Sequence, residues 1–361
     1  MKNRPHPAPQ VRSARRQRGL SVVELMVGLT IGMLLVAGLA LMFSNATRSS
    51  VELEKTVRHI ENGRQAIDLL SEDIALAGFY GTVPVTTYAA GLSPCADGTA
   101  VATDLAAQAL ASPLTIPFPV EGIFPSQAAY GADANGLSCL ANRKSGTPAL
   151  VLRRLDTTLT AAGGTLRPNA AYVQTSHSAA DNFYSYKAAS NGTGFTLRDG
   201  AGATNGIRRF ITRAYYIATC SDCSGSGDGI PTLTRLEIIG TQTFISPLAE
   251  GIEQIGFDYG FDTNADGIPD AWYGLNDQAG SSEYATAAGK GWGNVVALRI
   301  AVISRNTTPT TGQNDTNTYL VGRQGDVEKT IALPAGSAAY KHRSLVATVR
   351  LQTVAGLREK P

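Results

Sequence analysis

Residues Arg15–Phe43 read RRQRGLSVVELMVGLTIGMLLVAGLALMF. Three arginines and Gly19 precede an apolar run, residues 20–43, in which Glu24 is the single charged residue. As an α-helix this run would be about 36 Å long, enough to cross a hydrocarbon core of about 30 Å with some tilt. Basic residues ahead of it favour a cytoplasmic N-terminus, with the rest of the chain across the membrane. The stretch therefore predicts a single membrane-spanning helix.

Glu24 is an unusual residue for such a helix. A carboxylate in hydrocarbon costs about 2.5–3.5 kcal/mol on insertion scales, so an intramembrane acid indicates a functional site unless it lies near the interface. The order of basic leader, Gly19, Leu20, Glu24 and apolar helix resembles the class III signal of type IV prepilins. The resemblance implies cleavage between Gly19 and Leu20 by a prepilin peptidase and N-methylation of Leu20, which is more often Phe in the family.

The resemblance also implies that Glu24 sets the register of assembly. After cleavage, Leu20 would carry a cationic amine, which the Glu24 carboxylate of a neighbouring helix can neutralise. Two desolvated opposite charges favour one register, because either charge is costly when it is left unpaired. Gly28 and Gly32 add a GxxxG spacing, which allows two membrane helices to approach closely.

The composition excludes nucleic-acid binding. The chain has 361 residues and a net charge of +2, but residues 1–19 hold six of its 31 basic residues and no acid. The remainder carries 25 basic against 29 acidic residues, and no basic patch or stripe is present. The positive charge therefore belongs to the leader.

The helix is expected to continue beyond the membrane run. Apolar residues recur three or four positions apart from Ser44 to Leu76, with charged residues on the other faces, and Gly78 is a natural C-terminal cap. A separate soluble helix is the alternative. The expected organisation is a cleaved leader, a transmembrane half-helix, an amphipathic half-helix, a variable connection and a sheet domain, at residues 1–19, 20–43, 44–78, 79–147 and 148–361.

Strand-like segments follow in the last part of the chain. With one long helix ahead of them, strands joined by turns predict an α+β fold in which the helix packs on an antiparallel β-sheet. The expected strand segments are Ala149–Leu155, Asn182–Lys187, Ile207–Thr219, Thr232–Gly240, Phe244–Phe261, Trp292–Arg305 and His342–Gln352.

Several stretches resemble the PilW family of type IV minor pilins. They are the acidic-aliphatic segment Gln65–Gly81, the VVALR run at residues 295–299 that follows Trp292, and the closing ATVRL at residues 347–351. The family ending Leu-Arg-Asn departs here to Leu-Gln-Thr. The resemblance implies a type IV pilin-like fold.

The same resemblance implies the partners and the location. The expected partners are other minor pilins, the major pilin, the prepilin peptidase, an inner-membrane assembly platform and a large pilus-tip adhesin. The protein would cross the bacterial inner membrane once, with a periplasmic domain, and would then enter the pilus to prime its assembly and support adhesion and twitching motility. The alternatives are a pseudopilin of type II secretion and, more distantly, a membrane-anchored periplasmic calcium-binding module or enzyme.

The sequence predicts no enzyme. The four histidines are scattered along the chain, and no HExxH, GxSxG or P-loop motif occurs.

The four cysteines all follow the membrane run. An even number on the oxidising side of a membrane favours disulfides. The simplest pairing joins Cys95 to Cys139 and Cys220 to Cys223, although three connectivities exist. A metal or redox role for the CxxC at residues 220–223 is the alternative.

The stretch Asp262–Asp270, DTNADGIPD, predicts a calcium loop. Asp262, Asn264 and Asp266 place oxygen ligands at positions 1, 3 and 5, a glycine stands at 6 and Asp270 at 9, as in the first part of an EF-hand. Tyr273 replaces the bidentate glutamate of position 12, so the loop would need further ligands. An Asx-rich turn without metal is the alternative.

Overall fold

The computed structural model describes residues 19, 21–83, 87–125, 127, 130, 136–161, 163–181, 185–192, 194–274, 291–324, 327–334 and 336–359. The chain forms two compact units, Met1–Glu54 and Lys55–Pro361.

Helix α1 is continuous from Val22 to Leu76 and links the two units. Its apolar part is long enough to cross a membrane and is uncovered on every side, with exposed fractions such as 76% at Phe43. Gly78 follows with a φ of +78°, and its N–H donates to the carbonyl of Arg153 at 3.0 Å. The expected single long helix is thereby observed, and its glycine cap adopts the left-handed conformation that ends helices.

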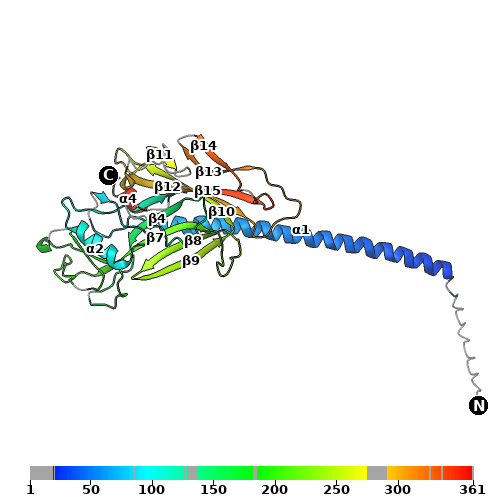
Figure 1. The fold of residues 1–361 in the computed structure, drawn as a ribbon, viewed down its shortest axis with the longest axis horizontal. Coiled ribbons are helices and arrows are strands. Elements are labelled where there is room, and N and C mark those ends of the chain that lie inside the picture. The colour runs from blue at the N-terminus through cyan, green and yellow to red at the C-terminus, as the bar shows by residue number, and fades with distance from the viewer. Residues whose placement is uncertain are drawn as a thin grey trace, which may run out of the picture. The chain divides into compact units, whose positions relative to one another are not determined.

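The second unit is built mainly of strands (Figure 1). Among the described residues, its helices after α1 are α2 (Gly98–Ala109), the 3₁₀ turns η1 (Ala179–Asp181) and η2 (Trp292–Asn294), and α4 (Gln352–Gly356). Its strands are β1 (Tyr88–Ala89), β2 (Ile116–Pro117), β3 (Val120–Ile123), β4 (Ala149–Leu155), β5 (Tyr172–Thr175), β6 (Tyr186–Ala189), β7 (Ile207–Ala218), β8 (Thr232–Ile239), β9 (Gln242–Glu250), β10 (Ile252–Phe261), β11 (Ala271–Gly274), β12 (Val295–Arg305), β13 (Thr318–Gln324), β14 (Val327–Ala332) and β15 (His342–Arg350).

The strands form two main sheets rather than the one sheet expected. The seven-stranded sheet runs β3-β4-β7-β5-β6, with β8 added to β7 and β9 to β8, and the four-stranded sheet runs β11-β10-β12-β15. Both are antiparallel throughout, which confirms the α+β layout. Two small pairs remain among the described residues, the parallel β1–β2 and the antiparallel β13–β14.

The second half of α1 packs where the two sheets meet. Ala66, Leu70 and Ile74, on one helical stripe, are fully buried. They belong to one core cluster with Tyr215 of the seven-stranded sheet and Phe257 of the four-stranded sheet. Each large apolar side chain buried here contributes about 1.5–3 kcal/mol, so this stripe binds the helix to both sheets.

Asp73 is a buried acid on the same helix. Its Oδ1 accepts hydrogen bonds from Nε of Arg154 at 3.0 Å and from Nη1 of Arg213 at 2.9 Å, and its Oδ2 accepts one from the Tyr215 hydroxyl at 2.8 Å. Burial alone would raise the pKa of Asp73, but Arg213, Tyr215 and Arg154 together hold it below its ordinary value. The charged carboxylate therefore fixes both the rotation of the helix about its axis and its position along that axis relative to β4 and β7.

The expected strand segments agree with β4, β7, β8, β12 and β15 to within a few residues. The segment Phe244–Phe261 was expected as one strand and is divided between β9 and β10. Gly251 makes the turn with a φ of +70°, and a Cβ there would lie 2.4 Å from the carbonyl oxygen of Arg305. The Asn182–Lys187 segment lies partly outside the described residues, and β6 begins at Tyr186.

Replacing Asp73 by Asn should lower the free energy of unfolding by about 3–5 kcal/mol, because Arg154 then stays buried without its counter-charge and Arg213 keeps only Glu237. Urea unfolding of the full chain in detergent measures the change. Asp68→Asn is the matched control, since Asp68 is exposed on the same helix, and it should change stability by less than about 0.5 kcal/mol. Equal losses in both variants would contradict the role of Asp73.

Candidate functional site

The prepilin-like signal lies at the beginning of α1. Gly19 is outside the helix, which begins at Val22, and the carbonyl of Ser21 accepts a hydrogen bond from the N–H of Leu25 at 3.1 Å. Glu24 therefore stands in the first turn, where a carboxylate is favoured by the helix dipole. Leu20 and residues 1–18 lie outside the described residues, so cleavage and N-methylation stay predictions.

Two threonine hydroxyls in the first unit are bonded within α1 itself. The hydroxyls of Thr30 and Thr47 donate to the carbonyls of Val27 and Phe43, each at 2.9 Å. A helix that is apolar all round is stable only in lipid or among other helices. A Cβ added at Gly28 or Gly32, the two glycines of the GxxxG spacing, would have no other atom within 4 Å beyond its chain neighbours and the helix's own backbone. The helix surface is therefore open to partners.

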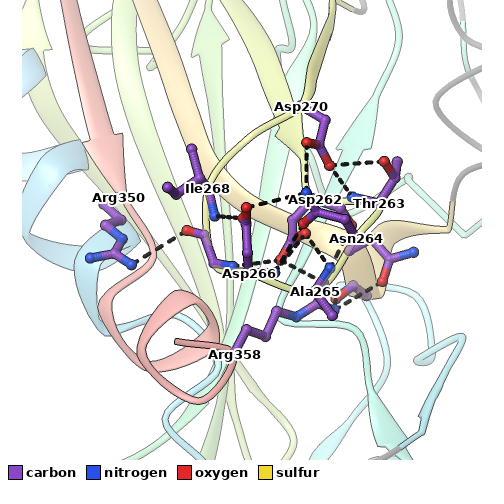
Figure 2. A network of polar contacts seen from close by, with 12 residues as sticks. Asp262, Thr263, Asn264, Ala265, Asp266, Ile268, Asp270, Arg350 and Arg358 are labelled. Atoms are coloured by element: carbon purple, nitrogen blue, oxygen red, sulfur yellow. Dashed lines mark hydrogen bonds and ion pairs between the residues drawn. The ribbon is translucent and has the colours of Figure 1, made fainter. Parts of the chain in front are cut away.

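The Asp262–Asp270 loop joins β10 to β11 and is folded around Asp262 (Figure 2). Oδ1 of Asp262 accepts from the N–H of Ala265 at 2.7 Å, and Oδ2 accepts from the N–H of Gly267 at 2.9 Å. Asp262 is 1% exposed. Burial raises its pKa, but the Gly267 N–H and the Arg358 guanidinium outweigh burial and lower it. The carboxylate is therefore the charged centre of the loop.

The remaining polar side chains close the loop on its exposed side. Oδ2 of Asp270 accepts from the N–H of Thr263 at 2.6 Å and from its hydroxyl at 2.8 Å. The amide of Asn264 donates to Asp266 at 3.2 Å and to Asp270 at 3.3 Å. Gly267, at a φ of +82°, supplies the turn that the spacing of the motif requires.

Arg358 connects this loop to α4 and η2. Its Nη1 lies 3.2 Å from Oδ2 of Asp262, and its Nη2 donates to the carbonyl of Gly293 at 2.7 Å and to Oδ1 of Asn294 at 2.9 Å. The guanidinium therefore holds three segments together. Beside it lies a cleft of about 540 Å³, whose lining includes Tyr88 and Phe118.

The loop arrangement bears directly on the calcium prediction. Both oxygens of Asp262 accept from N–H groups, and Oδ2 also faces a guanidinium. Among the described residues no group of three or more His, Cys, Asp or Glu side chains is arranged to hold a metal ion. In this geometry Asp262 accepts from the protein's own donors, and a calcium ion would have to compete with them. Calcium binding by the loop stays a prediction.

The structure contains both of the expected disulfides. Cys95 is bonded to Cys139, in the connection, and Cys220 to Cys223, between β7 and β8. The first closes a stretch of 44 residues and the second a stretch of three. A disulfide stabilises a fold more when it closes a longer loop. Cys95–Cys139 is therefore expected to contribute more to the stability of the fold than Cys220–Cys223.

Sequence reasoning missed two residues that position these sites, Asp73 and Arg358. Asp73 falls between Leu70 and Ile74 on the apolar stripe, so helical periodicity could have marked it as a buried acid. Arg358 follows a short helix and is separated from Asp262 by 96 residues. No local pattern connects those two side chains.

Asp262→Ala should lower the free energy of unfolding by about 1–3 kcal/mol, because buried N–H donors and Arg358 lose their acceptor. Asp266→Ala, at an exposed position of the same loop, should cost less than about 1 kcal/mol. Thermal unfolding of both variants measures the difference. An Asp266 variant as unstable as the Asp262 variant would contradict this account of the loop.

The calcium prediction is checked by isothermal titration calorimetry of the full chain with CaCl₂. The sequence motif predicts a dissociation constant of about 10⁻⁵–10⁻³ M, with binding lost in Asp270→Asn. A titration without heat at millimolar calcium would exclude the site.

Two protein families match parts of this chain. Residues 214–353 match the family described as Type IV Pilus-assembly protein W, and residues 14–40 match the Prokaryotic N-terminal methylation motif. No curated protein and no solved structure matches the chain. The first match includes the Asp262–Asp270 loop, and the second includes Gly19 and Glu24. The chain therefore carries a prokaryotic N-terminal methylation motif and a region similar to the PilW family of type IV pilus-assembly proteins.

Proposed function

We propose that this protein is a minor pilin that takes part in priming type IV pilus assembly. It is cut between Gly19 and Leu20, N-methylated at Leu20, and joins other minor pilins and the major pilin through α1. In this proposal its role is structural, and no reaction is assigned to it. The match to a family of pilus-assembly proteins supports this role.

The observation that carries the proposal is the contrast between the two parts of α1. The part in the second unit is covered along Ala66, Leu70 and Ile74, whereas the apolar part is exposed on every face. One charged side chain, Glu24, stands at the beginning of that exposed surface. This combination suits a helix that waits in a membrane and then exchanges lipid for neighbouring helices in a fibre.

The proposed location follows from the same helix. The arginines of the leader keep the N-terminus in the cytoplasm, and the second unit lies in the periplasm of the bacterial inner membrane before assembly. The disulfides are consistent with that oxidising compartment. Once assembled, the protein would belong to a tip complex that supports adhesion and twitching motility, with a pilus-tip adhesin as a further partner.

The test is complementation of a deletion strain with wild type, Glu24→Ala and Glu61→Ala. Glu24→Ala should reduce surface pili by more than about tenfold, since loss of a buried charge pair costs about 3–5 kcal/mol. Glu61 is an exposed acid in the other half of α1, and its variant should behave as wild type. Intact mass measurement should find N-methylated Leu20 at the N-terminus of all three proteins.

The same strains separate the two assembly machines. Loss of twitching and of pili with unchanged protein secretion supports the pilus. Loss of secreted proteins with normal pili would replace this proposal by a pseudopilin of type II secretion. Normal piliation with Glu24→Ala would contradict the role of Glu24.

A further inference from the structure

His59 lies in the contact between α1 and the four-stranded sheet. It stands on the helix two turns before Ala66 and is 4% exposed. Its Nδ1 is 3.4 Å from Oγ of Ser304, at the end of β12. The Ser304 hydroxyl lies 3.4 Å from the carbonyl of Arg343 in β15, to which it donates. A neutral His59 that donates from Nδ1 therefore completes a chain of hydrogen bonds from the helix to β15.

The helix and the sheet touch closely at this point. A Cβ added at Gly63, one turn after His59, would lie 2.7 Å from Cδ1 of Leu345 and 3.0 Å from Oγ of Ser304. Water therefore has little room to enter between the helix and β12 or β15. A charge created on His59 would have to be accommodated by the protein itself.

The charged groups that act most strongly on His59 are all basic. They are His342 and Arg343 of β15, and Lys341 directly before that strand. On the helix itself Lys55 and Arg58 precede His59, and Glu61 follows it. A second positive charge beside this group of cations is unfavourable.

His342 is itself buried and only half satisfied. Its side chain is fully covered, and its Nδ1 lies 3.0 Å from Oδ2 of Asp315. Its Nε2 is buried and has no hydrogen-bond partner among the described residues. Asp315 and Glu253 favour the charged form of His342, whereas burial and Arg305 oppose it. Protonation of His342 would create a buried N–H without an acceptor among the described residues.

We propose that His59, bonded to Ser304, is a proton-sensitive latch that holds α1 on the four-stranded sheet. Protonation of His59 adds a positive charge at a buried position on which Lys341 and Arg343 already act. Acidification therefore weakens the attachment of residues 55–66 of the helix. The attachment at Asp73 is a carboxylate paired with two arginines, and it keeps its charge at the same pH. The helix therefore loosens at one end of its contact and stays fixed at the other.

The pH range follows from the direction of the shifts. Burial, followed by His342, Lys341 and Arg343, lowers the pKa of His59 below its ordinary value of 6.5, and the pKa of His342 is lowered as well. Well above pH 6.5, His59 is neutral in both the released and the attached helix, and the latch is at full strength. As the pH falls below 6.5, the released helix takes up protons before the attached helix does, so the attachment weakens.

Hydrogen–deuterium exchange of the full chain in detergent micelles tests this inference at pH 7.5 and pH 5.5, after correction for the intrinsic exchange rate. Protection of residues 55–66 should fall by up to about tenfold per pH unit below 6.5, whereas residues 70–77 should keep their protection. His59→Gln should remove the pH dependence. His177→Gln, which changes a histidine bonded to Thr82 instead, should retain it.

Two results would overturn the latch. One is equal protection of residues 55–66 at both pH values in the wild type, and the other is the same acid loss in His59→Gln. If His59→Gln does not fold, NMR titration of His59 in the wild type decides the question. A midpoint below 6.5 supports the latch, and a midpoint at or above 6.5 excludes it. None of these measurements depends on pilus assembly, so they can fail while the proposed function stands.

Discussion

Helix α1 has to satisfy two different surroundings along one continuous set of backbone hydrogen bonds. Its first part is apolar all round, whereas its second part is apolar along one stripe and charged elsewhere. Because the helix is continuous, its rotation in the second unit is fixed by side chains such as Leu70 and Asp73. The sheets are arranged around that stripe, and Tyr215 of one sheet and Phe257 of the other belong to the same core cluster as the stripe.

Buried ion pairs recur wherever distant segments of the chain meet. Besides the Asp73 cluster, Arg153 of β4 is 1% exposed and is bonded to Glu121 of β3 and to the Tyr130 hydroxyl. Glu253 of β10 likewise lies 2.6 Å from Arg305 of β12. Such pairs add little net stability over apolar packing, but breaking one is costly. They therefore select one arrangement of helix, connection and sheets over other compact arrangements.

The sequence predicted those parts of the fold that local patterns determine. A short apolar segment located β4, the turn at Cys220–Cys223 located β7 and β8 on either side of it, and alternating residues located β15. The DTNADG spacing located the turn at Gly267. In contrast, α2 is rich in small residues, and its clearest local signal is Asp97, whose carboxylate caps the N–H of Ala100 at 2.8 Å. Strands β13 and β14 carry mixed polar residues without a clear period. The division into two sheets depends on which strands pair, and pairing is a long-range property.

In the candidate site, too, contiguous motifs could be predicted from the sequence, whereas contacts between distant residues could not. The prepilin signal and the Asp262 loop are contiguous motifs and could be read directly. The contacts of Arg358, of Asp73 and of His59 with Ser304 each join residues far apart in the chain, so only the folded structure brings them together. The two disulfides are an intermediate case, since even cysteine numbers suggested them and the fold determined their pairing.

The segments that form the core are synthesised at different times. Gly78 ends α1 against Val354, and Leu351, Val354 and Ala355 belong to the same core cluster as Leu70 and Ile74. The helix is synthesised first, and the core around it is completed by side chains that lie nearly 280 positions later in the chain. Contacts of such high sequence separation form slowly. Until residues 351–355 are available, the apolar stripe of α1 stays uncovered, and a chain at that stage would depend on other proteins to keep that surface from aggregating.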